Sequence, residues 1–235
     1  MTHMNQNIKM IDEVSILLNE LTDKVVFVGG AITSLLLTDP ALSDIRPTKN
    51  VDVIVEINSY IDYSKLEELL RNKGFKQRVS SQDPLCRWKI GNNIVDFMPT
   101  DTKILGFTNL WYSDAINNYY LQKMPGGKTI KIVTPPYFIG TKIEAFLGRG
   151  NYDFIMSHDI EDIITVIDGR EELTNEIKVS PPDLKQYIQH HLSEFKNNHQ
   201  FRDAITGYLP TDIYSQNRFS VIVNRIQKIC TDQGI

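Results

Sequence analysis

Two apolar, strand-like runs of this 235-residue chain each carry a single carboxylate. Residues 51–55 contain Asp52, and residues 94–98 contain Asp96. An ionised carboxylate inside an otherwise buried strand is costly unless something compensates its charge. Where acids converge, a divalent metal is a common compensation, because hard cations prefer oxygen ligands. The two runs therefore predict a sheet that carries both acids and a polar site beside them.

A third apolar run, residues 25–28, leads directly into Gly29-Gly30. A glycine pair between a strand and a helix lets backbone N–H groups approach a phosphate. The following residues 31–37 are predicted to form a short helix, in which Ser34 is a further candidate for phosphate contact. Gly-Gly after a strand is also a common turn, so a purely structural interpretation stays open.

Asn50 stands two residues before Asp52, where a second metal ligand is expected. Side chains two apart in a strand share one face. We therefore predict that Asn50, Asp52 and Asp96 converge beside the glycine pair and hold Mg²⁺ or Mn²⁺ through oxygen atoms. The alternative is that the two acids lie at strand edges and pair with Arg87 or Lys49.

Lys142 lies in a predicted helix over residues 135–147, and Arg149 follows seven residues later. A lysine after a mixed sheet is usually a solvated surface charge. The functional interpretation is that Lys142 is a solvent-lined point charge for the β- and γ-phosphates of a nucleotide, with Arg149 on the same side.

Asp159 and Asp162 begin the next predicted helix, for which Ser157 is a suitable N-cap. The two acids are three residues apart and share one helix face. They are candidates to support a nearby lysine or to contact a substrate. Acids in a first turn also stabilise the helix dipole, so this interpretation stays open.

The pattern predicts an α/β (α+β) fold in which a mixed sheet is flanked by helices, followed by a helical C-terminal region. Strand candidates lie at 25–28, 51–57, 75–79, 85–90 and 93–98, a hairpin at 118–133, and helices at 8–21, 31–37 and 63–73. From residue 135 onward the pattern is helical, with two long amphipathic helices over 182–232. We place the domains at 1–134 and 135–235.

Composition narrows the class of protein. A hydrophobic content of 41% with 23% charged residues is typical of a globular chain. The net charge of −4 excludes an overall basic surface for nucleic acid. The two cysteines lack zinc-ligand spacing, the N-terminus lacks a signal-peptide pattern, and no apolar run reaches about 18 residues. We expect a cytoplasmic protein without a membrane segment.

Taken in order, these motifs resemble the nucleotidyltransferase fold of the DNA polymerase β superfamily. Within it, the chain resembles the bacterial AbiEii-type nucleotidyltransferases, the toxin half of some toxin–antitoxin and phage-defence pairs. The resemblance spans about residues 25–168 and rests on four motifs: Val28-Gly29-Gly30-Ala31, Thr48-Lys49-Asn50-Val51-Asp52-Val53, Lys142-Ile143-Glu144-Ala145-Phe146 through Arg149, and His158-Asp159-Ile160-Glu161-Asp162-Ile163.

The resemblance implies transfer of a nucleoside monophosphate from an NTP to a hydroxyl of RNA, tRNA or protein, with Mg²⁺ or Mn²⁺ as cofactor and an antitoxin protein as a possible partner. It implies three groups of site residues: catalytic Asp52, Asp96, Lys142, Asp159 and Asp162; nucleotide-binding Gly29, Gly30, Ser34, Lys142 and Arg149; and metal-binding Asn50, Asp52 and Asp96.

The chain departs from this family at Asn50, where the family normally has an acid, and in the longer stretch between Gly30 and Asn50. An amide removes one negative charge from the metal site but still offers a carbonyl oxygen. The alternative function is therefore a catalytically weakened nucleotide-binding or partner-binding module of the same fold. A structural partner that binds no nucleotide is a third possibility. For an RNA acceptor, a basic patch on the C-terminal helices would draw on Lys185, Lys196, Arg202, Arg218, Arg225 and Lys228.

Overall fold

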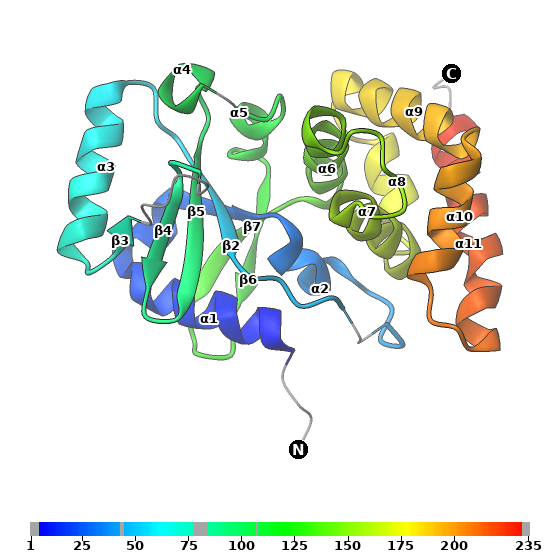
Figure 1. The fold of residues 1–235 in the computed structure, drawn as a ribbon, viewed down its shortest axis with the longest axis horizontal. Helices are drawn as coiled ribbons and strands as arrows, with labels where there is room; N and C mark the ends of the chain where they lie inside the picture. The colour runs from blue at the N-terminus through cyan, green and yellow to red at the C-terminus, as the bar shows by residue number, and fades with distance from the viewer. Residues whose placement is uncertain (1–4, 43–44, 78–83, 107, 232–235) are drawn as a thin grey trace. The chain divides into compact units, whose positions relative to one another are not determined.

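The computed structural model describes residues 5–42, 45–77, 84–106 and 108–231 (Figure 1). The chain divides into two compact units. Unit 1 comprises Met1–Leu35 and Ser43–Thr134, and unit 2 comprises Leu36–Leu42 and Pro135–Ile235. The short segment Leu36–Leu42 thus groups with the C-terminal helices, whereas it falls inside the predicted domain 1–134.

Unit 1 is built on one mixed sheet whose strand order is β3-β4-β5-β2-β1-β7-β6 (Figure 1). The pairs β2–β5 and β1–β7 are parallel, and the other neighbouring pairs are antiparallel. The predicted α/β class with a mixed sheet is confirmed. The strands are β1 (Val25–Val28), β2 (Val51–Val55), β3 (Lys76–Gln77), β4 (Arg87–Ile90), β5 (Asn93–Pro99), β6 (Tyr119–Lys123) and β7 (Thr129–Val133).

The central strands are those predicted from continuous apolar runs. Every residue of β1 is buried, and Asp52 is the one residue of β2 that is not. The β4–β5 hairpin turns at Gly91-Asn92, as predicted, because Ile90 pairs with Asn93 and Gly91 has a positive φ of 56°. The strand predicted at 75–79 runs beyond the described residues, and its described part is the short β3.

The helical elements of unit 1 include α1, which contacts β2 and β5 of the sheet (Figure 1). Helix α3 begins three residues earlier than predicted, because the Ser59 side chain accepts a hydrogen bond from the backbone of Asp62 and caps it. The short helix predicted at 31–37 is a 3₁₀ turn followed by one α-helical turn. The bounds are α1 (Gln6–Leu18), η1 (Asn19–Lys24), η2 (Gly30–Ile32), α2 (Thr33–Leu36), α3 (Tyr60–Asn72), α4 (Thr102–Leu105) and α5 (Tyr112–Ala115).

Unit 2 is helical. Its helices are α6 (Pro135–Arg149), α7 (His158–Gly169), α8 (Leu173–Lys178), α9 (Pro182–Lys196), α10 (His199–Tyr208) and α11 (Ile213–Thr231). The prediction of two helices over 182–232 is wrong, since three are present. The additional break falls at Asn197-Asn198, where Asn198 caps α10 by accepting a hydrogen bond from the backbone of Gln200.

An aromatic cluster forms part of the core of unit 2. Phe146 of α6, Phe154 of the following loop, Phe195 of α9 and Phe201 of α10 are all buried. Their contacting ring centroids lie between 4.8 and 5.7 Å apart. Tilted and edge-on aromatic contacts at these distances add stability beyond the buried area. The cluster joins α6 to the consecutive helices α9 and α10, which lie more than 30 residues later in the chain.

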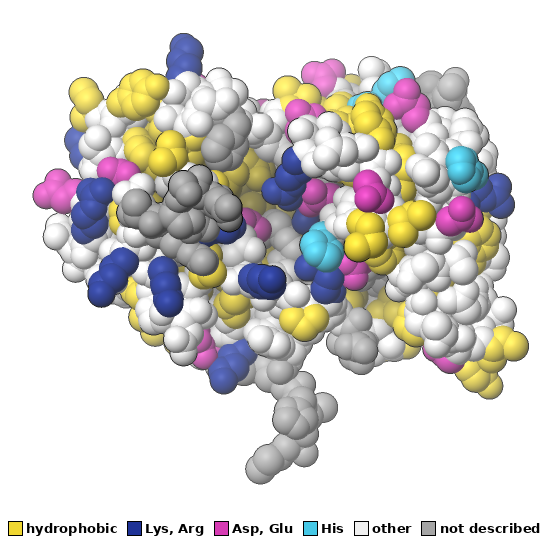
Figure 2. All heavy atoms as spheres, in the orientation of Figure 1, with side chains coloured by type: hydrophobic (Ala, Val, Ile, Leu, Met, Phe, Trp, Pro, Cys, Tyr) yellow, Lys and Arg dark blue, Asp and Glu magenta, His cyan; other side chains and the backbone are white. Residues whose placement is uncertain are grey.

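Acidic side chains are interspersed with separate Lys and Arg side chains on the face drawn in Figure 2. This arrangement agrees with the slightly negative net charge of the chain. Among the described residues, no helix combines the length and the apolar composition that crossing a bilayer requires.

Candidate functional site

The sheet register brings Asp52 and Asp96 together. Asp52 of β2 is paired directly with Asp96 of the parallel strand β5, and with Val28 of β1 on its other side. Residues paired in this way project from the same face of a sheet. Asp96 is buried, with 4% of its surface exposed, and Asp52 is half-buried. Two carboxylates therefore share one face at the end of β1.

Asn50 joins the two acids. Its amide nitrogen Nδ2 donates hydrogen bonds to Asp52 Oδ1 at 2.8 Å and to Asp96 Oδ2 at 2.9 Å. As predicted, the three side chains converge. The amide NH₂ stands between two carboxylate oxygens, which is the position that a cation between them would take. That these residues bind a metal stays a prediction.

Arg87 of the neighbouring antiparallel strand β4 forms an ion pair with Asp96. Its Nε donates to Asp96 Oδ1 at 2.8 Å and its Nη2 to Asp96 Oδ2 at 2.6 Å, a bidentate ion pair. The structure thus contains the Arg87 pairing that is the alternative to a metal site for Asp96. It follows from the hairpin, because a two-residue turn at Gly91-Asn92 places Arg87 opposite Asp96. Arg87 thus belongs to the site, although it was not among the predicted site residues.

The acid pair imposes a negative potential on the buried Cys86 thiol nearby. Burial, together with the charges of Asp96 and Asp52, raises the pKa of Cys86 to about 12. A thiol in this environment stays protonated at neutral pH and is a poor nucleophile. Cys86 therefore contributes packing to the site, whereas the negative charge of the site comes from the carboxylates.

Gly29 is required by the close approach of Asp52. Its φ is +73°, and a Cβ atom at this position would lie 2.1 Å from Asp52 Oδ2. A side chain at position 29 therefore displaces the carboxylate. Gly30 is buried and begins the 3₁₀ turn η2. The hydroxyl of Ser34 is buried and makes no hydrogen bond to any residue in the described part of the chain.

Asn7 supports the segment that precedes Asn50. This fully buried residue of α1 donates from Nδ2 to the carbonyl of Arg46 at 2.9 Å and accepts from the backbone N–H of Thr48 at 2.9 Å. Thr48 in turn donates to the carbonyl of Asn50 at 3.2 Å. The backbone at position 50 is thereby linked, through Thr48, to a residue more than 40 positions earlier in the chain. No local pattern in the sequence points to Asn7.

The second set of predicted site residues lies in unit 2, where Lys142 is buried between two acids. Its Nζ lies 3.0 Å from Asp159 Oδ1 and 2.6 Å from Asp162 Oδ2. Only 7% of the residue is exposed. The expectation of a solvent-lined lysine is wrong, because the packing of α6 against α7 encloses the ammonium group.

Burial alone would lower the pKa of Lys142, but Asp162 and Asp159 together hold it above its ordinary value. Burial opposes ionisation of Asp159 as well, and the charges of Lys142 and Arg149 nevertheless keep the pKa of its carboxyl below the usual value. Arg149 reaches Asp159 with Nε at 3.2 Å and Nη2 at 3.1 Å, while its side chain stays 72% exposed. Asp159 and Asp162 near the start of α7 thus form an ion-pair cluster with Lys142, in addition to any effect on the helix dipole.

Some of the basic residues of the C-terminal helices are engaged inside unit 2. Arg218 pairs with Asp168 at 2.8 Å and with Asp39 at 2.9 Å. Arg225 donates to the backbone carbonyls of Ile167 and Asp168. Both guanidinium groups are engaged in contacts within unit 2. Arg218 and Arg225 are therefore less available to the predicted basic patch.

The solved structures to which this chain is similar include the following two proteins. One is an antigenic nucleotidyltransferase-like protein from Paracoccidioides brasiliensis, with 18% identity over 85% of this chain and 93% of that chain and a TM-score of 0.49. The other is JHP933 from Helicobacter pylori, with 12% identity over 98% of this chain and 95% of that chain and a TM-score of 0.48. No protein-family model and no curated protein matches the sequence.

Proposed function

We propose that this chain is a nucleotidyltransferase that moves a nucleoside monophosphate from an NTP to a hydroxyl group. The observation that carries the proposal is the convergence of Asn50, Asp52 and Asp96 at the end of β1, directly beside Gly29. Buried carboxylates are costly unless their charge is compensated, and here only part of it is compensated by Arg87. Their positions agree with the motifs by which the sequence resembles nucleotidyltransferases.

The donor set fits a divalent cation. Oxygens of Asp52 and Asp96 both lie within hydrogen-bond distance of one point, now taken by the Asn50 amide nitrogen. Rotation of that amide about its terminal torsion presents its oxygen instead and completes a set of hard oxygen ligands. Asn50, Asp52 and Asp96 would then hold Mg²⁺ or Mn²⁺, which supplies charge neutralisation for a triphosphate and its attacking hydroxyl.

The glycine turn supplies the phosphate contacts in this proposal. The backbone N–H groups of Gly29 and Gly30 would bind phosphate, and the buried Ser34 hydroxyl, which makes no hydrogen bond to the described residues, would be a further donor. Lys142 and Arg149 are assigned to the triphosphate on the sequence resemblance. The proposed task of Asp159 and Asp162 is to keep the Lys142 ammonium charged and oriented, a task for which their contacts are suited.

One observation favours a second candidate, a nucleotide-binding or partner-binding module with little catalytic activity. Arg87 engages both oxygens of Asp96, and the Asn50 amide donates to both acids. The protein itself thereby neutralises part of the charge that a metal ion needs. A metal site that has lost one carboxylate and shares another with a guanidinium is expected to bind Mg²⁺ weakly.

The test measures binding and transfer separately. Calorimetry with each NTP, with and without Mg²⁺, reports binding, and labelled NTP with bulk tRNA or protein reports transfer. We expect NTP binding and slow transfer by this chain, and loss of transfer in Asp52→Asn. Transfer that survives in Asp52→Asn contradicts the proposal, whereas binding without any transfer favours the second candidate.

The acceptor, toxin and antitoxin assignments are also part of the proposal and rest on the motif resemblance. If the chain is a toxin, its induced expression in a bacterial host slows growth, and the Asp52→Asn form does not. Equal growth of both cultures at matched protein levels removes the toxin assignment and leaves the nucleotidyltransferase proposal standing.

A further inference from the structure

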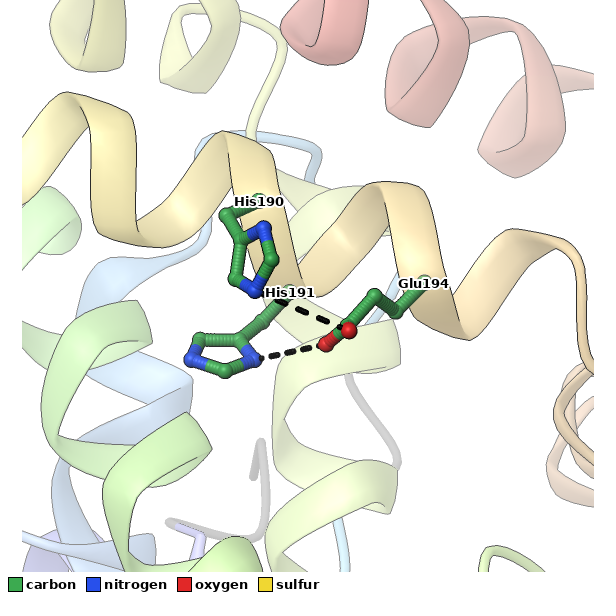
Figure 3. A group of neighbouring side chains, drawn as sticks. All are labelled: His190, His191 and Glu194. Atoms are coloured by element: carbon green, nitrogen blue, oxygen red, sulfur yellow. Dashed lines mark hydrogen bonds and ion pairs between the residues drawn. The ribbon is translucent and has the colours of Figure 1, made fainter.

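Helix α9 presents three side chains of metal-binding type that the proposed function does not use. His190, His191 and Glu194 lie on one part of the helix, and both imidazole rings turn toward the carboxylate (Figure 3). His190 Nε2 lies 3.6 Å from Glu194 Oε1, and His191 Nδ1 lies 3.1 Å from Glu194 Oε2. One ligand atom from each residue lies within 4.8 Å of the other two.

These separations are close to those of a bound transition metal. Metal–nitrogen and metal–oxygen bonds of about 2.0–2.2 Å in a tetrahedral site put neighbouring ligand atoms roughly 3.3–3.5 Å apart. The two contacts to Glu194 lie on either side of this range and involve different oxygens of its carboxylate. Binding of one ion by all three residues requires side-chain rotations that bring the three donors, which lie within 4.8 Å of one another, to this separation.

His191 is held in place by its neighbours. Its ring centroid lies 4.6 Å from that of Tyr187, edge-on, and 6.2 Å from that of Phe195. The Tyr187 hydroxyl donates to Glu144 of α6 at 2.6 Å. The side chain of His191 is only 16% exposed, whereas His190 and Glu194 are 65% and 57% exposed. One ligand is therefore preorganised, and two are accessible from solvent.

Helical His–Glu pairs also occur as simple ion pairs, as His158 and Glu161 of α7 do at 3.2 Å. That pair has one imidazole and one carboxylate. Within the described part of the chain, the α9 cluster is the one group of three His, Cys, Asp or Glu side chains whose ligand atoms come so close. The second imidazole distinguishes the α9 cluster from an ordinary His–Glu pair.

We propose that His190, His191 and Glu194 form a binding site for a borderline divalent transition metal of the Zn²⁺ class, with the remaining coordination open to water. Two imidazoles select such ions over Mg²⁺, which prefers an all-oxygen site. All three ligands belong to one helix of unit 2, so the site does not depend on the proposed nucleotidyl transfer.

The test is a calorimetric titration of the tag-free chain with Zn²⁺, in a Cys230→Ser background that removes the partly accessible thiol. We expect a single ion per chain. His190→Ala and Glu194→Gln should each weaken binding at least about tenfold, since loss of even a residue that only supports a metal ligand typically costs that much. The double variant His190→Ala/His191→Ala should abolish binding.

His158→Gln is the matched control, because it removes an exposed histidine that is paired with one glutamate only. It should bind Zn²⁺ as the parent does. Thermal unfolding adds a second readout: Zn²⁺ should raise the Tm of the parent and not that of the double variant, because only a folded-state ligand stabilises. Absence of Zn²⁺ binding by the parent, or unaltered binding by the double variant, overturns the proposal.

Discussion

The acid cluster of unit 1 (Asn50, Asp52 and Asp96) and the lysine cluster of unit 2 (Lys142, Asp159 and Asp162) differ in how the charge of their carboxylates is compensated. In unit 2, Asp159 and Asp162 enclose a buried ammonium group, and full charges of opposite sign face each other. In unit 1, Arg87 forms an ion pair with Asp96, and the partner that Asp52 and Asp96 share is a neutral amide. An amide satisfies hydrogen bonds but does not cancel charge.

We infer from this difference that the unit 2 cluster serves mainly the stability of the fold and the unit 1 cluster mainly its chemistry. A buried, charge-matched cluster rigidifies the fold, and removal of one partner leaves uncompensated charge behind. Two carboxylates held by one guanidinium and one amide keep a formal negative charge that a cation can use. The comparison predicts that substitutions in unit 2 act mainly on stability, whereas substitutions around Asn50 act mainly on chemistry.

The largest expected effect is that of Lys142→Ala. Loss of the ammonium leaves two buried carboxylates without their main counter-ion, and we expect a loss of about 3–5 kcal/mol in the free energy of unfolding. Urea unfolding measures it. Arg149→Ala is the matched control, because Arg149 contacts the same Asp159 from solvent and should cost no more than about 1 kcal/mol. Equal losses in both variants contradict the distinction between buried and exposed partners.

The expected loss of stability also affects how nucleotide binding by Lys142→Ala must be measured. A variant that removes Lys142 weakens the fold and NTP binding together, so binding must be measured under conditions where the variant is folded. If folded Lys142→Ala binds NTP as the parent does, the assignment of Lys142 to the triphosphate is wrong and its role is structural.

The next largest effect is expected for Asn50→Asp. A third carboxylate strengthens a hard-cation site, and we expect transfer at saturating NTP and Mg²⁺ to rise at least about 100-fold, which is roughly 2.7 kcal/mol of transition-state stabilisation. Pyrophosphate release measures it. In EDTA the same variant should be less stable than the parent, because three acids then repel one another. Equal transfer rates in both forms show that the amide is an adequate ligand.

A smaller effect is expected from Gly29→Ala. The added Cβ meets the Asp52 carboxylate at 2.1 Å, and overpacking of this kind costs about 1–3 kcal/mol. Gly127→Ala is the control, since Gly127 also has a positive φ but nothing within 4 Å of the added atom. The difference between the two unfolding free energies isolates the clash with Asp52. A difference near zero means that the carboxylate moves aside freely.

The smallest expected effect is a pH dependence confined to unit 2. The pKa of Asp159 is depressed, so its stabilisation is present above its unfolded pKa of about 3.9 and is lost as pH falls through the folded value. The pKa of Lys142 is raised, so its stabilisation is present below about 10.4 and is lost as pH rises through the folded value.

The stability difference between the parent and Lys142→Ala should therefore be constant near neutral pH and shrink at both extremes. Urea unfolding across the pH range measures it. A difference that grows on acidification reverses the sign and contradicts the ion-pair assignment.

Much of unit 1 was accessible from local patterns. The apolar runs predicted β1 and β2, and the Gly91-Asn92 turn predicted the β4–β5 hairpin. Those elements in turn put Asp52 and Asp96 on one face. The same two-residue turn also sets the strand register that pairs Arg87 with Asp96. The α9–α10 break was missed, because the apolar spacing continues across Asn197-Asn198 and only the cap geometry reveals the new helix.

The sequence by itself determined the local elements and the chemical character of their residues, because strand alternation, helix periodicity and turn chemistry act over a few neighbouring positions. Tertiary structure alone decided which partners those residues meet. Lys142 is enclosed only because α6 packs against α7, and Asn7 anchors the segment before Asn50 only because α1 lies against that segment. Burial and charge pairing depend on contacts between elements distant in the chain, and a local pattern carries no record of them.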